Sequence, residues 1–236
     1  PRIFDKNIPH HIFYPPYIQT YIERDILNIK SITDKTVFLR FIKLCAGRTG
    51  QLLNYTQLAN DCGISVNTAK AWLSLLESSF IIFLLPPFYK NINKQLSKSP
   101  KLYFYDTGLL TYLLDIKSAD QMTYHYLKGS IFENFVIAEI MKQLNNNYST
   151  FSSFFIRDKT GNEVDLNITI DKSAYVEIKS SKTWQKEYGK SILYFNNLIE
   201  ANKLFVIYDG SQEIVQNKIE IKSWKNIDSL LKSITS

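Results

Sequence analysis

Two carboxylates and one amine are spaced so that a β-hairpin can bring them together. Asp165 lies in one stretch of alternating apolar and polar residues (161–170), and Glu177 and Lys179 lie in a second (174–181). Such alternation is typical of a half-buried strand, whose successive side chains point to opposite faces. A short polar segment between the two stretches supplies the turn. The sequence therefore predicts a hairpin that gathers these three groups.

Alternation also predicts the orientation of the first strand. Val164, Leu166, Ile168 and Ile170 fall on one face, and Asp165 falls on the other. An apolar layer would therefore lie behind the polar groups of the hairpin.

The three side chains have the chemistry of a site for a divalent cation. Mg²⁺ and Mn²⁺ prefer hard oxygen ligands, which paired carboxylates supply. A neighbouring ammonium group can stabilise negative charge or move a proton. The alternative is a surface salt bridge between Glu177 and Lys179 on an ordinary strand. A second Glu-x-Lys triplet at 220–222 shows how readily so short a motif arises by chance.

Residues 53–77 have the pattern of a helix-turn-helix. Thr56 and Ser65 can cap its two helices, and Gly63 can form the tight turn between them. In such a motif the second helix meets the major groove of DNA with its outward residues. The outward residues here are Asn67, Thr68, Lys70, Ala71 and Ser74.

Two strands joined by a basic loop are predicted after the helix-turn-helix. They cover 80–88 and 101–106, which gives the order of a winged helix. The lysines suited to phosphate contacts in this wing are Lys90, Lys94, Lys98 and Lys101. The second helix of the motif carries one lysine and no arginine, so a protein-binding module or a lid beside an ATPase core is the alternative.

Length and charge set the domain organisation and the class of partner. The chain has 236 residues, enough for two modest domains, and the polar stretch 115–121 predicts a boundary between 118 and 119. A net charge of +6 and a pI near 9.1 fit contact with a polyanion such as DNA. A mildly basic protein with no nucleic-acid partner is the alternative.

Several function classes are not indicated. The two cysteines and three histidines lack metal-ligand spacing, and buried thiols predict a reducing cytoplasm. The longest apolar run, 80–88, is too short to cross a bilayer, so no membrane contact is predicted. No phosphate-binding glycine loop is present, which predicts no nucleotide site in this chain.

The remaining elements follow from periodicity and caps. Residues 1–16 are expected to be irregular, and helices are predicted over 17–32, from a cap at 33 or 34 to 46, and over 109–114. Beyond these, helices are predicted over 130–144, 184–199 and 227–234, and strands over 151–157, 203–208 and 218–221. The continuous apolar run 203–208 is typical of a strand covered on both faces.

Asp165 followed by Glu177-Ile178-Lys179 resembles the PD-(D/E)XK signature of restriction-endonuclease-like domains. The proline of the family's name is replaced by Val164, as in many members of that superfamily. Such domains usually add an acidic residue from a preceding helix, and the helix predicted over 130–144 offers one.

This resemblance implies a role for each residue of the signature. Asp165 and Glu177 would hold Mg²⁺ or Mn²⁺, and Lys179 would stabilise the attacking hydroxide or the transition state. Further metal contacts would come from the Ile178 carbonyl and from Glu133. Just before the hairpin, basic residues able to hold a phosphate are Arg157 and Lys159.

The chain as a whole resembles the C-terminal regions of prokaryotic AAA-type ATPases that end in the domain of unknown function 4143. The blocks that carry this resemblance are 17–26, 46–54, 98–109, 129–133 and 157–165. The resemblance implies an ATPase core upstream of Pro1 in the same protein, through which alone ATP would act.

The resulting expectation is an α+β chain with two domains. A helical linker and winged helix-turn-helix domain (1–118) would precede an α/β restriction-endonuclease-like domain (119–236). Its function would be metal-dependent phosphodiester hydrolysis, presented to DNA by the winged helix. The alternative is a catalytically inactive nuclease fold that binds protein or nucleic acid and regulates the ATPase.

Overall fold

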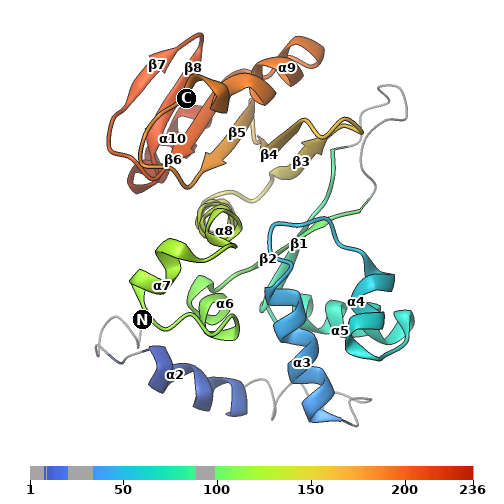
Figure 1. Ribbon diagram of the computed structural model, residues 1–236. Coiled ribbons are helices and arrows are strands. Elements are labelled where there is room, and N and C mark those ends of the chain that lie inside the picture. Colours follow the sequence, from blue (N-terminus) through green and yellow to red (C-terminus); the bar gives the residue numbers. More distant parts are fainter. Residues whose placement is uncertain (1–7, 9, 21–33, 89–98, 236) are drawn as a thin grey trace. The chain divides into compact units, whose positions relative to one another are not determined.

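The computed structural model describes residues 8, 10–20, 34–88 and 99–235. The chain divides into two compact units, Pro1–Leu84 with Leu102–Ile131, and Leu85–Lys101 with Phe132–Ser236 (Figure 1). The division therefore falls between Ile131 and Phe132 and not between 118 and 119 as expected. The physical reason is packing, because Ile116, Leu127 and Ile131 are buried in the core of the first unit.

The first unit is mainly helical, as the sequence predicted, and includes one pair of strands. Its elements are α2 (His10–Tyr17), α3 (Lys35–Ala46), α4 (Tyr55–Cys62), α5 (Val66–Ser78), β1 (Ile82–Leu85), β2 (Lys101–Phe104), α6 (Thr107–Leu113) and α7 (Ala119–Tyr124). The end residues Leu85 of β1 and Lys101 of β2 already belong to the second unit. Strands β1 and β2 pair with each other. Most of the helix predicted over 17–32 lies outside the described residues, as does the loop between the two strands.

Helix α2 is a correction, because residues 1–16 were expected to be irregular. It forms although Pro15 and Pro16 lie inside it. The Tyr14 side chain is 2% exposed, and its hydroxyl donates to Asp106 Oδ1 over 2.9 Å. Asp106 also caps α6 by accepting from two of its backbone N–H groups. Tertiary contacts therefore outweigh the low helix propensity of proline here.

The caps of the helix-turn-helix segment agree with the sequence in two places out of three. Ser65 caps α5, and Gly63 adopts the left-handed conformation at φ 73° that ends α4. The cap of α4 is Asn54, whose side chain accepts from the backbone N–H of Gln57 over 3.0 Å. The prediction of Thr56 was wrong because α4 begins at Tyr55.

Asn54→Ala is therefore expected to destabilise the first unit by about 1 kcal/mol, the usual effect of losing an N-cap. Thr56→Ala is the matched control and should change the free energy of unfolding by less than about 0.5 kcal/mol, since Thr56 is exposed. Urea denaturation followed by circular dichroism measures both. Equal effects of the two substitutions would contradict the assignment of the cap.

The second unit contains a six-stranded mixed sheet in the order β3-β4-β5-β6-β8-β7. Its elements, with helix α8 that leads into them, are α8 (Lys128–Asn147), β3 (Ser152–Arg157), β4 (Glu163–Thr169), β5 (Ser173–Lys179), η2 (Lys186–Gly189), α9 (Lys190–Leu198), β6 (Lys203–Tyr208), β7 (Ile214–Gln216), β8 (Ile219–Ser223), η3 (Trp224–Asn226) and α10 (Ile227–Thr235). The hairpin predicted from alternation is β4 and β5, which pair antiparallel. Strand β6 pairs parallel with both β5 and β8.

The centre of this sheet is covered on both faces. Phe205 and Val206, adjacent in β6 and so on opposite faces, are both 0% exposed. Figure 1 shows α8 below the strands and α9 above them. The apolar run 203–208 is thus a buried central strand, as predicted. Strand β7 was not predicted, because its three residues are too few to show periodicity and its Ile214 and Val215 are exposed.

The structure confirms the mixed α+β class, with a helical N-terminal part and a C-terminal sheet. Within the described part of the chain, no helix combines the length and the apolar character needed to cross a bilayer.

Candidate functional site

The predicted hairpin brings its two carboxylates and its amine into one site. The pairing of β4 with β5 runs from Thr169 opposite Ser173 to Leu166 opposite Val176. At the next position, Asp165 Oδ2 accepts a hydrogen bond of 2.8 Å from the backbone N–H of Ile178. The Asp165 carboxylate therefore lies against β5 at the residue between Glu177 and Lys179.

The other two groups form an ion pair beside it. Lys179 Nζ lies 2.6 Å from Glu177 Oε1. Asp165 and Glu177 are 6% and 5% exposed, whereas the Lys179 side chain is 34% exposed. The carboxylates are thus enclosed, and the amine remains accessible to a ligand from solvent.

A β-bulge at Asp165 changes the faces of β4. Ile156 pairs with Val164 and Phe154 pairs with Asn167, so one residue of β3 faces both Asp165 and Leu166. An extra residue of this kind re-aims side chains and is frequent beside active sites.

The bulge makes one prediction wrong. Asn167 lies opposite Tyr175 and shares its face. Val164 packs into the same cluster as Tyr175 and Ile192 of α9, although strict alternation would put Val164 and Asn167 on opposite faces. Val164 therefore does not share the face of Leu166 and Ile168, because the extra residue reverses the alternation between them.

A buried lysine joins the carboxylates, which corrects the role expected of Lys101. Its side chain is 2% exposed, so it does not lie at a wing surface where phosphates bind. Lys101 Nζ lies 3.0 Å from Glu133 Oε1, forms an ion pair with Glu163, and lies 4.0 Å from Asp165 Oδ1. The prediction was wrong because the partners of Lys101 are distant in sequence. Glu133 and Glu163 lie 32 and 62 positions after Lys101.

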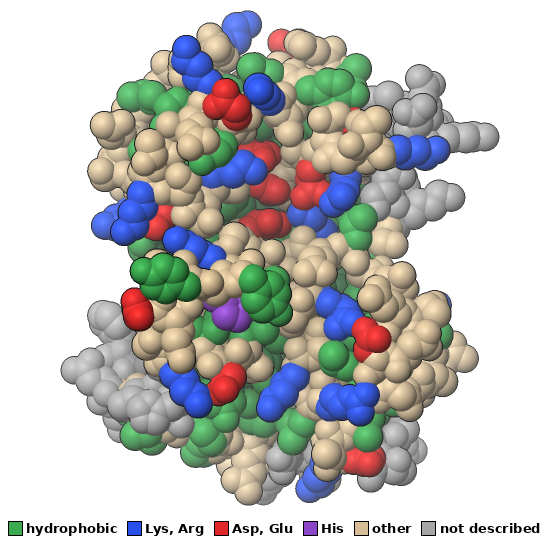
Figure 2. Space-filling view, viewed as in Figure 1, with side chains coloured by type: hydrophobic (Ala, Val, Ile, Leu, Met, Phe, Trp, Pro, Cys, Tyr) green, Lys and Arg blue, Asp and Glu red, His purple; other side chains and the backbone are tan. Residues whose placement is uncertain are grey.

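Glu133 lies in α8, as the resemblance to nucleases implied, and it contacts Lys101. Glu163 was missed by sequence reasoning and belongs to the same group. Its Oε2 accepts from Arg157 Nη1 over 3.0 Å, and its Oε1 accepts from Lys101. A signal was present, because Glu163 precedes Asp165 by two residues on one strand. Figure 2 shows acidic side chains gathered with lysine and arginine side chains over α8 and the strands beside it.

Burial and mutual repulsion govern the protonation of the carboxylates. Burial, followed by the charges of Glu177 and Glu133, raises the pKa of Asp165 well above its usual value, against the opposing effect of Lys101. Burial likewise raises the pKa of Glu177 to about 7, although Lys179 acts in the lowering direction. Burial alone would lower the pKa of Lys179, but the charges of Glu177 and Asp165 raise it. Both carboxylates of the pair therefore take up a proton more readily than exposed carboxylates do.

One buried carboxylate oxygen of the site, Glu177 Oε2, has no hydrogen-bond partner among the residues described. A buried carboxylate oxygen without a partner is costly, unless a cation or a water binds it.

Two carboxylates of the site, those of Asp165 and Glu177, are available as ligands for a divalent cation. Among the residues described, no group of three or more His, Cys, Asp or Glu is arranged to hold a metal ion. Glu133 and Glu163 are held by Lys101, which leaves Asp165 and Glu177 as the oxygen donors. Ile178 contributes a backbone N–H to Asp165. Two carboxylates completed by water fit Mg²⁺, which usually keeps several waters.

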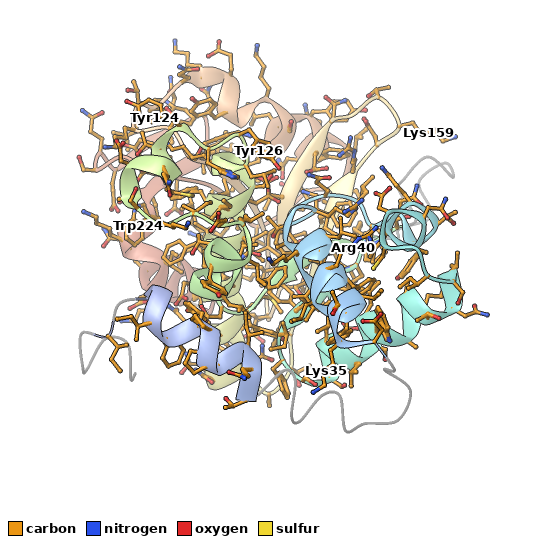
Figure 3. The ribbon with its side chains drawn as sticks, turned by 60° about the horizontal axis from the view of Figure 1, so that its bottom comes forward. Lys35, Arg40, Tyr124, Tyr126, Lys159 and Trp224 are labelled. Carbon is orange, nitrogen blue, oxygen red and sulfur yellow. The ribbon has the colours of Figure 1, made fainter. Side chains whose placement is uncertain are left out.

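The residues predicted to contact nucleic acid lie in different surroundings. Arg157 binds Glu163, while Lys159 is exposed in the turn between β3 and β4 and points away from the strands (Figure 3). In α5, Asn67 and Lys70 are exposed, and Thr68 is half-buried with its hydroxyl 2.8 Å from that of Ser65. Outside the described residues lie Lys90, Lys94 and Lys98.

Comparison with models of known protein families assigns the chain to a family. A model of a domain of unknown function, DUF8612, matches residues 1–120, just over half of the 236 residues. The chain belongs to the DUF8612 family. In this DUF8612 protein a second model, the domain of unknown function DUF4143, matches residues 128–227 and so covers the carboxylate site.

The DUF8612 protein also resembles curated mycobacterial proteins. It is 29% identical over 195 residues to the uncharacterized protein Rv2008c of Mycobacterium tuberculosis and to the uncharacterized protein Mb2031c of Mycobacterium bovis. The match covers 82% of this chain but only 43% of either relative, so the chain spans less than half of their length. No solved structure matches it.

Proposed function

We propose that the second unit is a metal-dependent phosphodiesterase domain of the PD-(D/E)XK nuclease-like type. The observation that carries the proposal is the buried Glu177 Oε2, which has no hydrogen-bond partner among the described residues and belongs to a carboxylate close enough to raise the pKa of Asp165. The order of elements supports it, since a helix precedes a hairpin that bears Asp165 and then Glu177-Ile178-Lys179.

Each residue of the site has a distinct task in such a reaction. A bound Mg²⁺ would supply the positive charge that a phosphodiester transition state requires. Asp165 and Glu177 would hold that ion, and the Ile178 N–H fixes the orientation of the Asp165 carboxylate. Lys179 Nζ can donate to a non-bridging phosphate oxygen, because the side chain is partly exposed while Glu177 holds its ammonium in place.

We infer that the first unit presents this domain to DNA as a winged helix and that an ATPase domain precedes it in the whole protein. The order α3-α4-α5-β1-β2 supports a winged helix, and the exposed Asn67 and Lys70 of α5 supply polar groups for DNA. Relatives more than twice as long as the matched region have room for an ATPase domain. The resemblance noted above supports that choice.

The proposal is tested by titrating the protein with Mg²⁺ in a calorimeter and by incubating it with labelled single- and double-stranded DNA and RNA. We expect a heat of binding and Mg²⁺-dependent cleavage of at least one substrate. A protein that neither binds Mg²⁺ nor cleaves any of them would overturn the proposal.

Lys179→Ala is expected to lower the cleavage rate by about 10²- to 10³-fold, the usual range for the loss of one preorganised charge-stabilising group. Its Mg²⁺ affinity should not fall, since an amine is not a ligand and its positive charge repels the ion. Lys182→Ala is the matched control in the segment that follows β5, where the exposed lysine has no place in the site. Equal rates for the two variants would contradict the role of Lys179.

A second candidate function is favoured by one observation. Lys101 already lies among three of the carboxylates, so that their charge is partly neutralised without a metal ion. The second unit would then be a nuclease fold that binds or regulates without catalysis. Manganese anomalous scattering from soaked crystals separates the two candidates, because only the first expects an ion between Asp165 and Glu177.

A further inference from the structure

The contacts of Lys101 set it apart from other lysines in ion pairs. Its ammonium is enclosed, with the side chain 2% exposed, and three carboxylates surround it. Lys203, by comparison, pairs with Glu220 over 3.4 Å and its side chain is 37% exposed. A fully buried ammonium is retained only where carboxylates compensate for its lost hydration. Lys101 and the carboxylate cluster, which consists of Glu133, Glu163, Asp165 and Glu177, therefore stabilise each other in the folded protein.

We propose that Lys101 is a tethered cation that holds the carboxylate cluster together without metal and weakens its affinity for a divalent ion. The second half of this statement rests on the proposed function, because it takes the pair Asp165 and Glu177 as the metal ligands. Lys101 is accordingly a positioning residue that acts on the site through Glu133, Glu163 and Asp165.

The balance of charge supports the proposal. Four carboxylates and three cations form the ion pairs of the cluster, which leaves one excess negative charge when all are ionised. Without Lys101 the excess is two negative charges, the amount that one divalent ion neutralises. The three carboxylates around Lys101 Nζ compensate the charge of its ammonium group.

The geometry also places Lys101 in competition with an ion. Its Nζ lies 4.0 Å from Asp165 Oδ1, so a divalent ion bound to Asp165 would meet a like charge close by in a poorly hydrated site. The 3.0 Å contact with Glu133 Oε1 draws that carboxylate toward the ammonium. Lys101 thereby limits how many carboxylates the ion can recruit.

The test compares wild type with Lys101→Met, which keeps the length of the side chain and removes its charge. We expect the Mn²⁺ dissociation constant, measured by titration calorimetry near neutral pH, to fall at least tenfold in the variant. Lys203→Met is the matched control and should bind Mn²⁺ as wild type does. A dissociation constant equal to or higher than that of wild type in Lys101→Met would overturn the proposal.

A double variant keeps the test decisive if Lys101→Met folds poorly without metal. Lys101→Met with Glu163→Gln removes the ammonium together with one of its counter-ions, so we expect a higher melting temperature than for Lys101→Met alone. The double variant should also bind Mn²⁺ more tightly than Glu163→Gln alone, which isolates the effect of the ammonium. No recovery of the melting temperature, or equal affinities in this second pair, would overturn the proposal.

The Mn²⁺ titrations involve no nucleic acid, so their result is independent of any cleavage assay. The role of Lys101 and the phosphodiesterase activity can therefore fail separately. Tighter Mn²⁺ binding in Lys101→Met without cleavage of any substrate supports the tethered cation and refutes the phosphodiesterase. Cleavage by wild type with no change of affinity in Lys101→Met supports the phosphodiesterase and refutes the tethered cation.

Discussion

Asp165→Asn is expected to reduce Mg²⁺-dependent cleavage of nucleic acid by about 10²- to 10³-fold or more, because it removes one of two charged ligands from a buried site. The amide has nearly the shape of the carboxylate. Its oxygen can still accept the hydrogen bond that the backbone N–H of Ile178 gives over 2.8 Å. The loss is therefore one of charge, with the geometry of the strand pair retained.

The fold of this variant should survive. Burial, followed by the charges of Glu177 and Glu133, raises the pKa of Asp165, so a neutral side chain here relieves both the loss of hydration and the repulsion. Lys101 keeps its closer partners Glu133 and Glu163. We therefore expect a melting temperature equal to or above that of wild type when no metal is present.

Asp171→Asn is the matched control, since this exposed aspartate lies in the turn of the same hairpin. It should leave both cleavage and Mg²⁺ binding unchanged. Cleavage rates from a labelled oligonucleotide, together with Mg²⁺ titration calorimetry of both variants, give the result. Full activity in Asp165→Asn would exclude the site as the catalytic centre.

Local patterns in the sequence predicted much of the fold of the second unit. The hairpin β4–β5 follows from alternation, and β6 follows from a continuous apolar run. Asp165, Glu177 and Lys179 could be placed together because all three lie on one hairpin, where a single turn fixes the register.

Long-range contacts explain what the sequence did not predict. Lys101 follows a basic segment and looks like a phosphate-binding residue, yet its partners come from α8 and β4. The bulge at Asp165 depends on how β3 pairs with β4, which alternation along one strand does not reveal. The boundary at Ile131 has the same origin, since the packing of Leu127 and Ile131 decides it.

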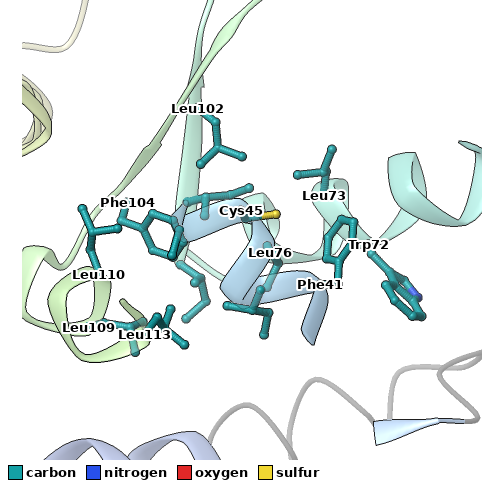
Figure 4. Close-up of a cluster of buried hydrophobic side chains, with 14 of the residues drawn as sticks. Phe41, Cys45, Trp72, Leu73, Leu76, Leu102, Phe104, Leu109, Leu110 and Leu113 are labelled. Carbon is teal, nitrogen blue, oxygen red and sulfur yellow. The ribbon is translucent and has the colours of Figure 1, made fainter. Parts of the chain in front are cut away.

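In the first unit, Phe41→Ala is expected to lower the free energy of unfolding by about 3–5 kcal/mol, the usual range when a buried phenylalanine is truncated. Phe41 is 0% exposed, and its ring lies edge-on to Trp72 with centroids 5.2 Å apart (Figure 4). The ring of Phe38 stacks against the ring of Phe41, with centroids 6.5 Å apart. Truncation would leave a cavity beside the rings of Phe38 in α3 and Trp72 in α5.

Phe80→Ala is the matched control, because the Phe80 side chain is 74% exposed. Its backbone has φ 55°, which strains alanine and phenylalanine alike, so the substitution tests only the loss of the ring. We expect a change of less than about 0.5 kcal/mol for this variant. Denaturant unfolding followed by circular dichroism measures both, with an unchanged slope against denaturant concentration as the sign that stability alone has changed. Equal effects of Phe41→Ala and Phe80→Ala would contradict the assignment of Phe41 to the core that α3 and α5 share.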